Sequence, residues 1–135
     1  MNSIKNYNQM LINRDEVLMG RDKEFPLSEI FEKNLTRLLQ SLNKLRLIYN
    51  KPMIVTSGYR PGHYNKSAKG AKLSAHLTCE AVDIKDPDGS FAKWCLQNIK
   101  HIVDCDLYME EPTYTKGWVH LQIRPTMSGR RVFLP

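Results

Sequence analysis

Apolar residues recur at helical spacing between residues 27 and 49, and mainly polar residues fill the positions between them. This period predicts a long amphipathic helix over 27–49. Pro26 lies near its start and Pro52 lies beyond its end, as is common at helix boundaries. A second stripe of the same spacing predicts another helix after a turn at 86–90. The two stripes consist of Leu27, Ile30, Leu35, Leu38, Leu39, Leu42 and Leu45, and of Phe91, Trp94, Cys95, Ile99, Ile102 and Val103.

Short apolar runs between turn signals predict the strands. These runs are 53–57, 80–84, 105–110 and 118–123, with a last edge strand at 130–135. Residues 58–74 contain three glycines and a proline and predict a long loop, and such loops in compact domains usually have a function. The pattern predicts an α+β fold in which two or three helices pack on one face of a small, mainly antiparallel sheet.

A chain of 135 residues is long enough for one compact domain, and we expect residues 1–25 to form an N-terminal extension that packs on it. No run approaches the ~18 apolar residues that span a bilayer, so we expect no membrane partner. The N-terminus lacks the basic-then-apolar plan of a signal peptide. We therefore expect synthesis in a cytoplasm, followed by release if the protein acts elsewhere.

The net charge of +6 and the pI of 9.3 favour an encounter with a polyanion, which includes nucleic acid and an anionic cell wall. The basic residues are spread along the chain and form no known nucleic-acid motif, so a small nucleic-acid-binding domain is the last of our hypotheses. Cys79, Cys95 and Cys105 are an odd number without C-x-x-C spacing, which predicts free thiols rather than disulfides or a structural zinc site.

Two segments have the chemistry of a metal site. His76 and Asp83 have opposite parity, so they converge only if His76 lies on the loop before the strand. In 118–123, Trp118, His120 and Gln122 share one face, and an antiparallel neighbour would place His120 beside Asp83. Two imidazoles, one carboxylate and a water are the ligands of a catalytic zinc ion. On spacing alone, the alternative is favoured, because a lone histidine on a strand is more often a hydrogen-bonded or surface histidine than a metal ligand.

The segment SAHLTCEAVDI resembles the S-x-H-x-x-G-x-A-x-D signature of the D-alanyl-D-alanine carboxypeptidase group of zinc peptidases. This group belongs to the LAS metallopeptidases, whose fold also occurs in the hedgehog signalling domain. Ser74, His76, Ala81 and Asp83 match the signature. WVHLQ is similar to the segment that supplies the third ligand, His120.

Two further segments extend the resemblance over residues 52–123. SGYRP is similar to the family segment that contains Arg60, and DLYME to the strand of the catalytic glutamate, near Glu110. Glu111 is an alternative, but it shares its parity with apolar Leu107 and Met109, so Glu110 more plausibly faces the site.

The resemblance implies Zn²⁺ bound by His76, Asp83 and His120, with Glu110 as the general base. It implies that Arg60 binds a substrate carboxylate, and that Ser74 and Trp118 line the substrate site or support it structurally. The implied function is hydrolysis of peptidoglycan stem or cross-link peptides, of D,D-carboxypeptidase or L,D-endopeptidase type, in a compact form typical of phage endolysins and virion-associated proteins. The bond cut and the oligomeric state are not specified.

Cys79 stands where the signature has glycine. A cysteine there predicts a different local turn, because glycine alone adopts unusual dihedrals freely. A thiolate beside a metal can also be a ligand, but the parity of Cys79 favours a buried, inert side chain. The alternative function is a non-catalytic, zinc-containing binding or structural module of the same fold.

Overall fold

The computed structural model describes residues 11–67 and 73–135, and its centre is a five-stranded sheet of order β1-β2-β4-β3-β5. Neighbouring strands are antiparallel except β3 and β5, which are parallel. The predicted α+β fold with a mainly antiparallel sheet is confirmed. The strands are β1 (Val55–Ser57), β2 (Ala81–Asp86), β3 (Tyr108–Glu110), β4 (Gly117–Gln122) and β5 (Val132–Phe133).

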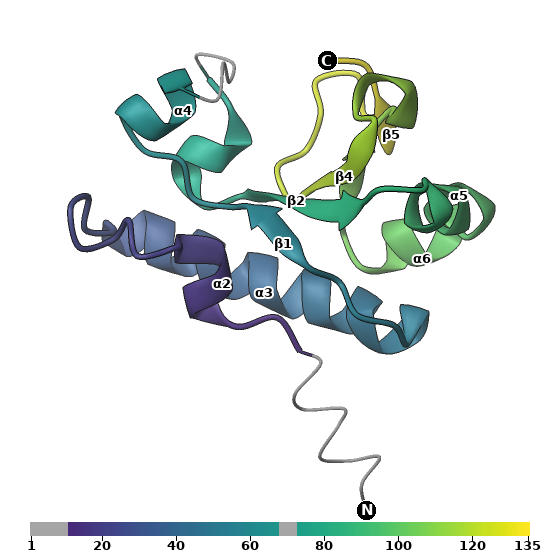
Figure 1. The fold of residues 1–135 in the computed structure, drawn as a ribbon, viewed down its shortest axis with the longest axis horizontal. Helices are drawn as coiled ribbons and strands as arrows, with labels where there is room; N and C mark the ends of the chain where they lie inside the picture. Colours follow the sequence, from purple (N-terminus) through teal and green to yellow (C-terminus); the bar gives the residue numbers. More distant parts are fainter. Residues whose placement is uncertain (1–10, 68–72) are drawn as a thin grey trace, which may run out of the picture.

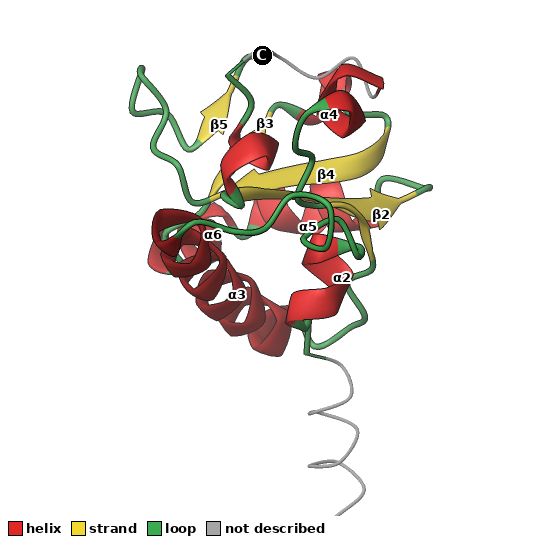
Figure 2. Ribbon diagram, turned by 90° about the vertical axis from the view of Figure 1, so that its left-hand side faces the viewer, coloured by secondary structure: helices red, strands yellow, loops and turns green. Residues whose placement is uncertain are grey.

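The helices divide between the two sides of the sheet. Helices α2, α3, α5 and α6 lie on one side of β2 and β4, and α4 lies on the other (Figures 1 and 2). Two short 3-10 helices occur in the connecting segments. The bounds are α2 (Arg14–Leu18), α3 (Glu29–Tyr49), α4 (His63–Ser67), η1 (Ala75–Thr78), α5 (Ser90–Gln97), α6 (Ile99–Asp104) and η2 (Pro112–Tyr114).

Helix α3 is the long amphipathic helix predicted over 27–49, and its start is set by a cap. The Ser28 hydroxyl accepts a hydrogen bond from the backbone N–H of Phe31, so the helix begins at Glu29. Its buried apolar residues begin at Leu35. Ile30 was predicted to lie in the apolar face, but it is 68% exposed, and its neighbour Phe31 is the residue of this turn that packs against the core.

The second predicted helix is interrupted. Asn98 has φ −125° and ψ 39°, so α5 ends at Gln97 and α6 begins at Ile99. The amide side chain of Asn98 donates to the backbone oxygen of Trp94, which stabilises the break. The prediction of one continuous stripe was therefore wrong at this residue, where a polar side chain competes for backbone hydrogen bonds.

The core lies between the sheet and the helices. Val82 and Ile84 of β2 pair with Leu121 and Val119 of β4, and all four are buried on the helical side. Burial of each such side chain contributes about 1.5–3 kcal/mol. Because successive side chains alternate, the intervening residues of both strands face away from the core.

The described part of the N-terminal segment packs against this core. Ile12, Val17 and Leu18 are buried, and Gly58 lies so close to Val17 that a Cβ atom at Gly58 would be 2.3 Å from the Val17 oxygen. Residues 1–10 and 68–72 lie outside the described residues. The predictions for residues 1–25 and for the loop 58–74 can therefore be compared with the structure only over residues 11–25, 58–67 and 73–74. Within the part that is described, no helix has the length and apolar character needed to span a membrane.

Candidate metal centre

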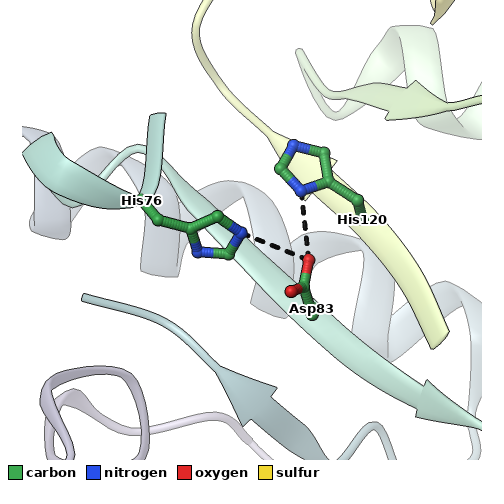
Figure 3. Close-up of side chains that lie close together, drawn as sticks. All are labelled: His76, Asp83 and His120. Atoms are coloured by element: carbon green, nitrogen blue, oxygen red, sulfur yellow. Dashed lines mark hydrogen bonds and ion pairs between the residues drawn. The ribbon is translucent and has the colours of Figure 1, made fainter. Parts of the chain in front are cut away.

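Three side chains from separate elements meet on the face of the sheet that points away from the core (Figure 3). Asp83 of β2 pairs directly with His120 of β4, and the His120 Nδ1 is 3.0 Å from the Asp83 Oδ1. His76 approaches from η1, with its Nε2 3.2 Å from the same oxygen. One ligand atom from each residue lies within 4.8 Å of the others. The predicted convergence of these three residues is present.

The helical turn η1 brings His76 to this face in spite of its opposite parity. The Ser74 hydroxyl accepts from the His76 backbone N–H, and the turn ends at Cys79. Cys79 has φ +61°, the left-handed conformation that favours glycine. We expected that a cysteine in place of the signature glycine would give a different local turn, and this prediction was wrong. The cysteine adopts it at a cost of about 1–2 kcal/mol. It is fully buried, and burial raises the pKa of its thiol to about 12, which makes it inert.

In each of the two histidines, the ring nitrogen that points away from Asp83 makes a hydrogen bond. This bond determines which nitrogen holds the proton, and therefore which nitrogen presents a lone pair to Asp83. The His76 Nδ1 lies 2.8 Å from the carbonyl oxygen of Gly58, which accepts, so this nitrogen has the proton in the neutral ring. The Gln122 side-chain nitrogen donates to the Arg124 backbone oxygen, which directs the Gln122 Oε1 toward the His120 Nε2 at 2.8 Å. The His120 proton therefore belongs on Nε2.

The consequence is that three acceptors face one another. The free nitrogens of His76 and His120 both point at a carboxylate oxygen of Asp83, and such a cluster is stable only with a cation or a proton among them. Ligands of a tetrahedral zinc ion with ~2.0–2.2 Å bonds lie about 3.4 Å apart, close to the distances of 3.0 and 3.2 Å observed here. The donor set and its backing hydrogen bonds fit zinc.

The electrostatics of the metal-free cluster are consistent with a shared cation. Burial opposes ionisation of Asp83, but the hydrogen bonds from His120 and His76 hold its pKa well below its ordinary value. Burial lowers the pKa of His76. Burial also acts to lower the pKa of His120, yet the hydrogen bond and charge of Asp83 outweigh it and raise this pKa. Without a metal, the shared proton therefore belongs mainly to His120.

The two glutamates at the end of β3 have different environments. Burial and the charge of Asp83 raise the pKa of Glu110, while the charge of His120 acts in the opposite direction, so Glu110 lies within the field of the cluster. Glu111 instead accepts from the backbone N–H of Thr113 at 2.8 Å and caps η2. This arrangement favours Glu110 as the residue that faces the site.

Arg60 lies beside the cluster. Its NH1 atom is 3.9 Å from the Asp83 Oδ2 and 3.5 Å from the Ser57 hydroxyl. Its buried Nε atom has no hydrogen-bond partner within the described residues. The hydroxyl of Ser74 is occupied by the His76 N–H, which favours a role in the turn. Trp118 is 38% exposed on the strand face of His120, where it is available to a substrate.

Sequence reasoning did not assign roles to three residues that support the cluster. Gly58 and Gln122 hold the two imidazoles, as described above. Arg124 joins η1 to the end of β4: its guanidinium donates to the Leu73 oxygen at 2.6 Å, to the Thr78 hydroxyl at 2.9 Å and to Glu80 at 3.0 Å. The one available signal was the shared parity of Gln122 and His120, because the other contacts join residues far apart in the chain.

An α+β domain in which a histidine and an aspartate of the sheet meet a second histidine from the preceding helical turn, with a glutamate and an arginine adjacent, is characteristic of zinc peptidases. Comparison with known families agrees: the Peptidase M15 family model matches residues 6–122. The chain therefore belongs to the M15 family of zinc-dependent peptidases, which confirms the resemblance seen in the sequence. The match ends before β5 and the segment that leads to it. No curated protein matches the chain significantly.

Proposed function

We propose that this protein is a zinc peptidase that hydrolyses peptide bonds of bacterial peptidoglycan, as a D,D-carboxypeptidase or an L,D-endopeptidase. The principal support is the convergence of three acceptor atoms from His76, Asp83 and His120, each histidine held by a backing hydrogen bond. We further propose that it acts on the cell wall after release from the cell or as part of a virion, since compact domains of this kind are typical of phage enzymes.

In this proposal zinc is held by His76, Asp83 and His120, and when bound it supplies Lewis acidity toward a carbonyl group and toward water. Glu110 would accept the proton of the attacking water and deliver it to the departing amine. Positioned acid–base groups of this kind contribute ~10²–10⁴-fold to the rate. Arg60 offers a planar guanidinium fork that suits a substrate carboxylate.

The test combines metal analysis of the purified protein with digestion of sacculi, with and without a chelator, and mass spectrometry of the fragments. We expect about one zinc per chain and chelator-sensitive release of peptide fragments whose masses identify the bond cut. Glu110→Gln should retain the metal and lose hydrolysis. Glu111→Gln is the matched control, because Glu111 caps η2, and it should retain activity.

Two outcomes would contradict this proposal. Turnover of Glu110→Gln at the wild-type rate would remove Glu110 from the mechanism. Stoichiometric zinc without cleavage of any wall peptide would favour the alternative, a non-catalytic zinc-containing module of the same fold.

A further inference from the structure

A cavity of about 520 Å³ lies at the C-terminal end of β4, beside the metal centre. Figure 1 shows the final segment of the chain passing beside β4 and β5, and this segment supplies most of the cavity wall. Most of the wall therefore lies outside residues 6–122, which the family model matches. The lining residues are Gln122, Thr126, Met127, Ser128, Arg130, Phe133 and Leu134.

Two of the lining residues also contact the metal centre. Gln122 accepts the hydrogen bond of the His120 Nε2, and the Phe133 ring packs edge-on against the His120 ring with centroids 5.9 Å apart. The cavity and the candidate metal centre thus share a wall.

The chemistry of the cavity is apolar with a single cation. Met127 and Leu134 are exposed large apolar residues that line the cavity. Arg130 is the one charged residue among the described lining residues, and no acidic group lines the cavity. Within residues 11–67 and 73–135, Arg130 makes no ion pair with a side chain.

The turn that presents Arg130 is held by its own hydrogen bonds. The Thr126 hydroxyl donates to the Arg130 backbone oxygen at 2.8 Å, and the Arg130 N–H donates to the Ser128 hydroxyl at 3.2 Å. The backbone at Arg130 is therefore ordered before any ligand binds, which reduces the entropy lost on binding.

The strand order places the functional groups in a row across the sheet. Arg60 follows β1, Asp83 lies on β2, His120 on β4, and Phe133 on β5 at the opposite edge. A peptide that crosses the strands over the metal centre can contact Arg60 at one end and the cavity at the other.

We propose that this cavity is a second substrate subsite, which binds a residue with an aliphatic stem that ends in a carboxylate. The apolar wall contacts the stem, and Arg130 binds the carboxylate. This inference rests on the proposed function, because it assigns the occupant to a peptidoglycan stem peptide. It implies that Arg60 and Arg130 bind different carboxylates of one substrate, on the two sides of the scissile bond.

The test measures binding of a synthetic stem pentapeptide to zinc-loaded Glu110→Gln protein by isothermal titration calorimetry. Three forms are compared: the free acid, the form amidated at the side-chain carboxylate of diaminopimelate, and the form amidated at the C-terminus. Adding Arg130→Ala should weaken binding of the free acid about 1.5- to 5-fold, the range for an exposed charge pair. It should leave binding of the side-chain amide unchanged, because that peptide lacks the carboxylate that Arg130 binds.

Arg37→Ala is the matched control, because it removes the same charge from an exposed position on α3, on the opposite side of the sheet. It should leave all three affinities unchanged. The inference is overturned if Arg130→Ala weakens all three peptides equally, if it weakens none, if Arg37→Ala has the same effect, or if no peptide binds.

The wild-type protein separates the two proposals. If the peptides bind with the expected dependence on Arg130 and none is cleaved, the subsite stands and the peptidase proposal fails. If they are cleaved and Arg130→Ala changes nothing, the peptidase proposal stands and the subsite fails.

Discussion

The hydrogen bond from His120 to Gln122 leads to a quantitative prediction about zinc affinity. Gln122→Met keeps the side-chain volume and removes the acceptor for the His120 Nε2–H, which lies 2.8 Å from the Gln122 Oε1. The His120 proton can then move to Nδ1, the nitrogen that faces Asp83. A neutral imidazole protonated on Nδ1 presents no lone pair to a metal at that position.

The expected loss follows from the role of such backing groups. Removing a partner behind a metal-bound histidine typically lowers metal affinity 10–100-fold. This corresponds to about 1.4–2.8 kcal/mol. A lost hydrogen bond alone accounts for about 0.5–1.5 kcal/mol, and the change of tautomer accounts for the rest. Gln122→Glu retains an acceptor for the Nε2–H and loses only the donor to the Arg124 oxygen, so it should lower affinity less.

The assay is competition for zinc against a chromophoric chelator, together with ¹⁵N–¹H spectra of the histidine side chains in the metal-free and zinc-bound protein. The zinc-bound wild type should show the His120 proton on Nε2. Thermal unfolding of the metal-free variants controls for loss of the fold. Wild-type zinc affinity in Gln122→Met, or a His120 proton on Nδ1 in the zinc-bound wild type, would refute the reasoning.

Three further predictions concern the supports of the site. Gly58→Ala should lower the free energy of unfolding by about 1–3 kcal/mol, because its Cβ would lie 2.3 Å from the Val17 oxygen; a change below ~0.5 kcal/mol in chemical denaturation would contradict this. Arg124→Lys keeps the positive charge but loses the guanidinium group whose hydrogen bonds join η1 to β4, so zinc affinity should fall while the far-UV circular dichroism spectrum is unchanged. Unaltered zinc affinity would show that these hydrogen bonds are dispensable. In metal-free protein, a ¹³C titration of the Glu110 carboxyl should have its midpoint above 4.5, because burial and the Asp83 charge favour the protonated form, and zinc should lower that midpoint. A metal-free midpoint at or below 4.5 would be inconsistent with a partly buried Glu110 within the field of Asp83.

The strands and the long helix could be predicted from local periodicity, because the alternation of side chains along a strand and the 3.6-residue repeat of a helix are properties of the backbone itself. The parity of Asp83 and His120 was therefore known from the sequence. The errors at Ile30 and Asn98 arose where tertiary packing or a side-chain hydrogen bond outweighed the local pattern.

The resemblance of short motifs indicated the candidate ligands, but their meeting point depends on pairings between distant residues. The register that sets Asp83 opposite His120 joins residues 37 positions apart in the chain, and His76 reaches them only because η1 precedes β2. The left-handed conformation of Cys79 shows the same limit, since the turn imposed a backbone geometry that the residue type does not favour.

By itself, then, the sequence determined the main strands, the long helix α3, the face of each strand on which Asp83 and His120 lie, and the candidate ligand set. Only the tertiary structure decided the hydrogen bonds behind the histidines, the environment that distinguishes Glu110 from Glu111, and the cavity formed by the C-terminal segment. The physical reason is that backbone periodicity acts over a few residues, whereas register, burial and electrostatic field depend on contacts among segments that the chain brings together only when it folds.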